Sequence, residues 1–178
     1  PSVTVPHTAS EFVLDGVLDE AAWQSAARIG PFIRYDGNGT GRWRTTAKLL
    51  WRDDALYVAF ECPDDHVHSP YSKDDEPIYE SEAVEMFIDA DGDRDEYVEL
   101  QAAPTGVRFD ASFKGGARQG MARGWNHPFE VGTRVEGSLN QASDTDKGWV
   151  SEWRIPFAGL IDSVGPVVPG TRWAVNFF

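Results

Sequence analysis

Apolar and polar residues alternate with a period of two along most of this 178-residue chain. Successive side chains of a β-strand point to opposite faces, so this alternation is typical of strands half-buried in a sheet. The pattern recurs at residues 46–51, 56–60, 83–89, 96–102, 107–113, 129–136, 149–155 and 173–178. Short turns between these segments predict an all-β, antiparallel β-sandwich of jelly-roll type. One short helix is expected at residues 19–27, with Asp19 as its N-cap.

Charge and cysteine content exclude several classes of protein. The formal net charge is −13, which argues against nucleic acid or an anionic membrane as a partner, because both require a basic face. The single cysteine, Cys62, excludes an internal disulfide framework and a zinc site with several cysteines. The length and the 41% hydrophobic content predict one folded domain over residues 1–178.

Acidic residues are concentrated between Glu61 and Glu99, where 15 carboxylates accompany only two basic residues. A solvated surface is the ordinary explanation of such a block. Two other interpretations are a calcium site and a set of acceptors for the hydroxyl groups of a polar ligand. Aspartates alternate around Gly92, and we name Asp91 and Asp93 as candidate calcium ligands, although a plain Asp/Gly turn also explains this segment.

The segments 83–89 and 96–102 are predicted to pair as a hairpin with two different faces. One face is aliphatic and is expected to lie in the core; its residues are Val84, Met86, Ile88, Val98, Leu100 and Ala102. The other face carries rings, carboxylates and an amide, from Glu85, Phe87, Tyr97, Glu99 and Gln101. Rings stack on the apolar face of a pyranose, and carboxylates accept hydrogen bonds from hydroxyls, so this face suits a sugar. The alternative is an ordinary solvated sheet face.

Five segments, in order along the chain, resemble family 9 carbohydrate-binding modules. They are residues 12–23 (FVLDGVLDEAAW), 47–51 together with 54–60 (AKLLW and DALYVAF), 77–89 (PIYESEAVEMFID), 148–156 (GWVSEWRIP) and 173–177 (WAVNF). The resemblance implies a β-sandwich that binds glycans without cleaving them and that is not an enzyme. It also implies attachment to a xylanase or related hydrolase domain, plant cell-wall polysaccharide such as xylan as partner, and calcium as a structural ion. We see no signal peptide, so an extracellular or periplasmic location follows from the resemblance alone.

The resemblance also suggests which residues hold the glycan. Family members grip the reducing end of a glycan between two tryptophans; Tyr79 occupies the first of these positions, and Glu85 that of a glutamate that accepts hydroxyl hydrogen bonds. Glu99 and Gln101 fall near a basic or polar position on the partner strand. The second tryptophan of the family lies beyond the strand that ends at Phe178, so the domain is expected to lack that C-terminal loop and strand. Trp125, between polar residues after the glycine-rich segment 114–124, is expected to contact the glycan as well.

Three other functions are compatible with parts of the pattern. Glu85 and Glu99 on neighbouring strands could lie about 5 Å apart, close to the carboxyl spacing of about 5–5.5 Å in a retaining glycoside hydrolase. Met86 on the aliphatic face, with Met121 in a loop, would suit a haem-binding domain. A protein-interaction or adhesion module would use the aromatic face to contact protein. Non-catalytic glycan binding is the function we expect.

Overall fold

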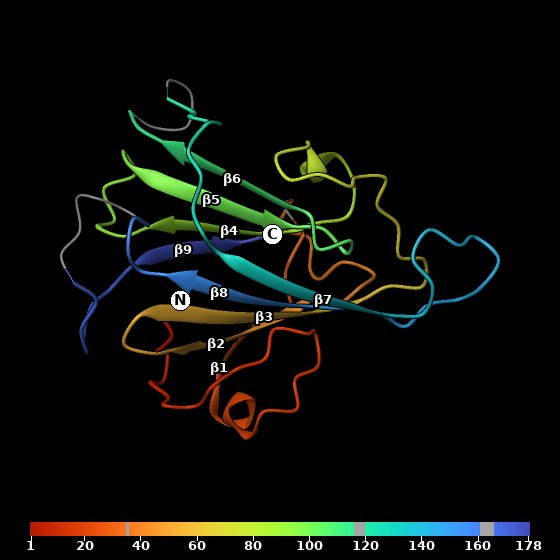
Figure 1. The fold of residues 1–178 in the computed structure, drawn as a ribbon, viewed down its shortest axis with the longest axis horizontal. Helices are drawn as coiled ribbons and strands as arrows, with labels where there is room; N and C mark the ends of the chain where they lie inside the picture. Colours follow the sequence, from red (N-terminus) through yellow and green to blue (C-terminus); the bar gives the residue numbers. More distant parts are fainter. Residues whose placement is uncertain (35, 116–119, 161–165) are drawn as a thin grey trace.

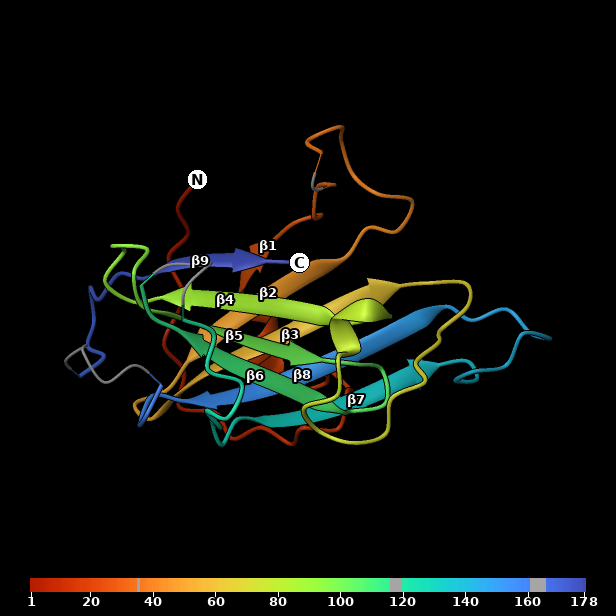
Figure 2. The same cartoon turned by 90° about the horizontal axis from the view of Figure 1, so that it is seen from above.

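Two antiparallel sheets pack face to face in the computed structural model, which describes residues 1–34, 36–115, 120–160 and 166–178. The five-stranded sheet has the order β1 (Ala27–Ile29), β2 (Thr46–Trp51), β3 (Ala55–Pro63), β8 (Gly148–Pro156) and β7 (Glu130–Glu136). The four-stranded sheet has the order β6 (Arg108–Phe113), β5 (Tyr97–Ala102), β4 (Val84–Asp89) and β9 (Ala174–Phe177). Figure 1 labels these strands, and Figure 2 shows the four-stranded sheet lying over the other. The predicted all-β sandwich is therefore confirmed.

The core between the sheets is filled by the aliphatic face that the alternation predicts. Val84, Met86 and Ile88 of β4 are almost completely buried, as are their neighbours on β5. Phe60 and Trp153 meet them from the five-stranded sheet, with ring centroids 4.8 Å apart. Burial of each large apolar side chain contributes about 1.5–3 kcal/mol. Met86, which the haem alternative requires, is fully buried among the side chains of this core.

The N-terminal segment covers the opposite, outer face of the five-stranded sheet (Figure 1, red to orange). Trp23 is buried there, and its Nε1 donates a hydrogen bond of 3.1 Å to Glu152 of β8. Glu152 also accepts bonds from the backbone nitrogens of Asp15 (3.2 Å) and Gly16 (2.8 Å). A Cβ atom at position 132 would lie 2.1 Å from the Leu14 carbonyl oxygen, so only glycine allows this segment to cross β7.

The helical content differs from the sequence prediction. Instead of a helix over 19–27, a single 3-10 turn, η1, spans Ala21–Ser25, and its N-cap is Glu20 with no side-chain cap, not Asp19. Ala27 already pairs with Leu49 as the first residue of β1, so sheet pairing ends the helix after one turn. A second 3-10 turn, η2 (Ile78–Glu80), was not predicted; its Ile78 is fully buried. No helix within the described residues is long and apolar enough to cross a membrane.

Candidate functional site

The outward face of the four-stranded sheet brings together most of the predicted site residues. The strand register aligns its side chains in three rows across the sheet: Phe109, Gln101 and Glu85; Ala111, Glu99, Phe87 and Asn176; and Phe113 with Tyr97. Three of the predicted residues, Glu85, Glu99 and Gln101, therefore lie on one surface. We call this surface, together with Tyr79, Arg123 and Phe178 described below, the aromatic–acidic face.

Aromatic rings border the carboxylates on the aromatic–acidic face. Tyr97 and Phe113 stack with centroids 4.6 Å apart, and Phe87 meets Phe178 edge to face at 5.7 Å. The Phe178 ring remains 52% exposed, and its backbone exchanges hydrogen bonds of 2.9 and 3.0 Å with that of Glu85. Sequence reasoning did not name Phe178, although the alternation of the last strand puts it on this side.

Tyr79 reaches the same face from the segment between β3 and β4. The buried Ile78 anchors η2 over the sheet and leaves the Tyr79 ring 40% exposed, edge to face with Phe109 at 5.7 Å. Arg123 approaches from the other side: its Nη2 donates a 3.3 Å hydrogen bond to the Tyr79 hydroxyl, and its guanidinium lies 5.9 Å from the Phe109 ring centre. Arg123 was not predicted, because no periodic pattern places a loop residue.

The two carboxylates differ in burial and in partners. Glu99 is only 8% exposed and accepts a hydrogen bond from Gln101 Nε2. Burial raises the pKa of Glu99, against the opposing effects of the Gln101 amide and the Arg123 charge. Glu85 is half-buried, and burial followed by repulsion from Glu99 raises its pKa to about 7. The site therefore holds two carboxylates that both favour the protonated form more than free glutamate does.

The strand register corrects the expected distance between Glu85 and Glu99, on which the glycoside hydrolase alternative depended. Glu85 lies directly opposite Gln101, while Glu99 lies opposite Phe87, so the two glutamates are diagonal neighbours. The backbones of diagonal positions in an antiparallel pair are about 7–8 Å apart, farther than those of directly opposite residues. The approach of about 5 Å that was expected from neighbouring strands alone is therefore wrong.

Trp125 is placed differently from the other predicted glycan contacts. Its ring is half-buried, packs against the core between the sheets and stacks on His127 with centroids 5.5 Å apart. Of the glycine-rich segment before it, residues 116–119 lie outside the described residues. Contact between Trp125 and a glycan stays a prediction, and we do not include this ring in the aromatic–acidic face.

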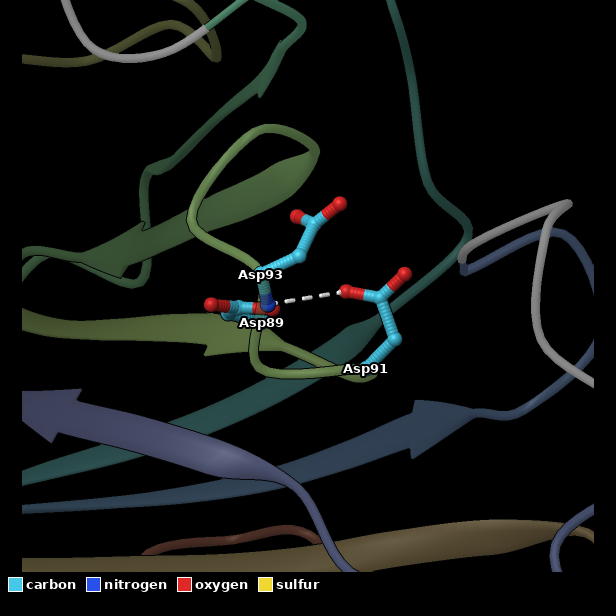
Figure 3. A group of neighbouring side chains, drawn as sticks. All are labelled: Asp89, Asp91 and Asp93. Carbon is cyan, nitrogen blue, oxygen red and sulfur yellow. Dashed lines mark hydrogen bonds between the residues drawn. The ribbon is translucent and has the colours of Figure 1, made fainter.

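The turn after β4 gathers the predicted calcium ligands. One carboxylate oxygen from each of Asp89, Asp91 and Asp93 lies within 4.8 Å of the others (Figure 3). Oxygen donors of this kind are those that Ca²⁺ prefers, so the residues fit the ion that the resemblance implies. The same carboxylates accept backbone hydrogen bonds within the turn, among them Asp93 N to Asp91 Oδ1 at 3.2 Å. The turn is thus held together by its own hydrogen bonds as well.

Calcium binding at this turn predicts a change in thermal stability. An ion at about 100 times its Kd adds about 2.7 kcal/mol, which would raise Tm by roughly 5–10 °C for a domain of this size. We expect that rise when calcium, but not magnesium, replaces a chelator in a thermal melt. The Asp91→Asn/Asp93→Asn variant should not respond, and equal melting of the unaltered protein with calcium and with chelator would contradict the prediction.

A two-sheet sandwich with exposed rings beside a half-buried carboxylate on one outer face is typical of a class of protein, the β-sandwich binding modules. The chain belongs to one particular family of them, described as carbohydrate family 9 binding domain-like, whose sequence profile matches residues 14–176. The predicted family is therefore confirmed.

Known proteins with similar sequences are much longer than this chain. It is 25% identical over 156 residues to endo-1,4-beta-xylanase A of Thermoanaerobacterium saccharolyticum, and 29% identical over 149 residues to endo-1,4-beta-xylanase C of Paenibacillus barcinonensis. These matches cover 88% and 83% of this chain but only 12% of either xylanase. The similarity thus concerns one module of each relative.

Solved structures agree on the fold. A family 9 carbohydrate-binding module from Caldicellulosiruptor kristjanssonii, in complex with cellotriose, superposes with a TM-score of 0.63 and 21% identity. The match covers 97% of this chain and 74% of that one. A putative carbohydrate-binding protein from Bacteroides uniformis gives a TM-score of 0.61 at 16% identity, over 86% and 71% of the two chains.

Proposed function

We propose that this chain binds glycans, without cleaving them, on the aromatic–acidic face. The observation that carries the proposal is the exposure of two rings, Tyr79 (40%) and Phe178 (52%), on the face that also presents the half-buried carboxylate of Glu85. Exposed rings offer stacking surfaces to the C–H face of a pyranose, and the carboxylate accepts hydrogen bonds from its hydroxyls. Glu99 is only 8% exposed and Gln101 is fully buried, so Glu85 is the carboxylate that a glycan reaches directly.

The family and the relatives suggest which glycans to test. Two relatives are xylanases, and a structural neighbour holds cellotriose. We therefore propose plant cell-wall polysaccharides of the xylan or cellulose type as partners, an attached hydrolase domain, and an extracellular or periplasmic location. A single open face of this kind supports Kd values of about 1 mM to 1 μM, or roughly −4 to −8 kcal/mol. Attachment to an enzyme raises the effective strength of such weak binding.

The absence of cleavage is part of the proposal. Glu85 and Glu99 do not lie directly opposite each other, and Glu99 accepts a hydrogen bond from the Gln101 amide.

The direct test is calorimetric titration with xylo- and cello-oligosaccharides, together with an assay for newly released reducing ends. We expect dissociation constants between about 1 mM and 1 μM and no release of sugar during long incubation. Release of reducing ends that stops in Glu85→Gln would show a hydrolase instead. Failure to bind any oligosaccharide or polysaccharide of a broad panel would favour the alternative, a protein-interaction module.

A further inference from the structure

The two carboxylates of the aromatic–acidic face differ in their supply of hydrogen-bond donors. Glu85 and Glu99 contribute four carboxylate oxygens, and the amide nitrogen of Gln101, opposite Glu85, donates to Glu99. Among the described residues, no lysine or arginine lies within ion-pair distance of Glu85, and no side chain or backbone N–H donates to its carboxylate. A ligand for this face must therefore bring donors of its own.

The guanidinium of Arg123 interacts with the other glutamate, Glu99. Arg123 bonds the Tyr79 hydroxyl at 3.3 Å, and its charge favours ionised Glu99. Within the part of the chain that the structure describes, the charged group that influences the Glu85 carboxylate is Glu99, which repels it. A positive charge beside Glu85 would offset the repulsion between the two carboxylates. It would also stabilise the ionised Glu85 carboxylate in place of the hydration that burial removes.

The surrounding rings strengthen the preference for a cation. Phe87 is the neighbour of Glu85 along β4, two residues away on the same face, and Phe178, the residue after β9, lies beside Glu85. The faces of aromatic rings carry partial negative charge and attract ammonium groups within about 6 Å. Carboxylates and rings together thus favour a positively charged group over a neutral one.

From the position of Glu85 between Glu99 and the aromatic rings, we infer that the aromatic–acidic face prefers glycans with free amino groups, such as glucosamine-containing oligosaccharides, over neutral glycans of the same length. The inference rests on the proposed function, since it names the ligand class of the same site. A protonated amine supplies three donors and no acceptor, whereas a hydroxyl supplies one donor and also carries acceptor lone pairs that the Glu85 carboxylate cannot use. The amine at carbon 2 of glucosamine stands where glucose has a hydroxyl, so the ring can stack as before.

The test compares three tetrasaccharides by calorimetry near neutral pH and at low salt: the glucosamine tetramer, its N-acetylated form and cellotetraose. We expect the glucosamine tetramer to bind about tenfold more tightly than cellotetraose, a difference of about 1.4 kcal/mol. The N-acetylated tetramer, which has bulk at carbon 2 but no charge, should show no such gain. Added salt should reduce the tenfold ratio, because it screens charge.

Two variants separate charge from stacking. Glu85→Gln should bring the affinity ratio of glucosamine tetramer to cellotetraose close to one, whereas Tyr79→Ala should weaken both ligands and keep the ratio. A ratio of one in the unaltered protein, with both ligands bound, would overturn the preference and leave the proposed function standing. Displacement of the glucosamine tetramer by ethanolamine at equal concentration would overturn the role of the sugar ring. If no tetrasaccharide bound, the proposed function itself would fail.

Discussion

Replacement of Glu152 by alanine should lower the free energy of unfolding by about 3 kcal/mol or more. Glu152 is fully buried and is the shared acceptor for the backbone nitrogens of Asp15 and Gly16 and for Nε1 of Trp23. Removal of the carboxylate leaves three donors without a partner, and each such buried donor costs about 1–3 kcal/mol. Urea denaturation followed by tryptophan fluorescence measures the loss.

The matched control, Glu152→Gln, tests the charge of this group separately. Burial, then repulsion from Glu20, raises the pKa of Glu152 to about 7, from an ordinary value of 4.5, against the hydrogen bonds it accepts. Because the folded-state pKa is the higher one, its stabilising contribution is complete below pH 4.5 and is lost as pH rises through 7. The unaltered protein should therefore lose stability between these values, and Glu152→Gln should lose less. Identical pH profiles for the two proteins would contradict this assignment.

Removal of both exposed rings, in the variant Tyr79→Ala/Phe178→Ala, should weaken glycan binding about a hundredfold. Each ring should account for about tenfold, since aromatic anchors typically contribute one to several kcal/mol to an interface. The rings are 40% and 52% exposed, so their loss should leave Tm nearly unchanged. Calorimetry with the tightest-binding oligosaccharide of the panel, together with a thermal melt, gives both quantities.

A suitable control is Val13→Ala, which removes a 67% exposed apolar side chain from the N-terminal segment, over the other sheet. It should change neither affinity nor Tm. Full affinity in the double variant would mean that glycan binds elsewhere, and Trp125 would then be the next ring to replace.

The strand pattern could be predicted because the direction of a side chain depends on its own backbone. Parity along β4 and β5 correctly separated the core residues, such as Met86, from the outward Glu85. Local reasoning failed for the helix. The sequence of residues 19–27 favours helix, but the burial of Trp23 and the pairing of Ala27 with Leu49 limit the helix to one turn.

The sequence by itself thus determined the fold class, the aliphatic core face and the outward position of Glu85, Glu99 and Gln101. Only the tertiary structure decided that Glu85 faces Gln101, that Arg123 and Phe178 join the site, and that Trp125 packs against the core. The physical reason is that alternation along one strand is a local property. Strand register and loop placement instead depend on hydrogen bonds and packing between segments far apart in the chain.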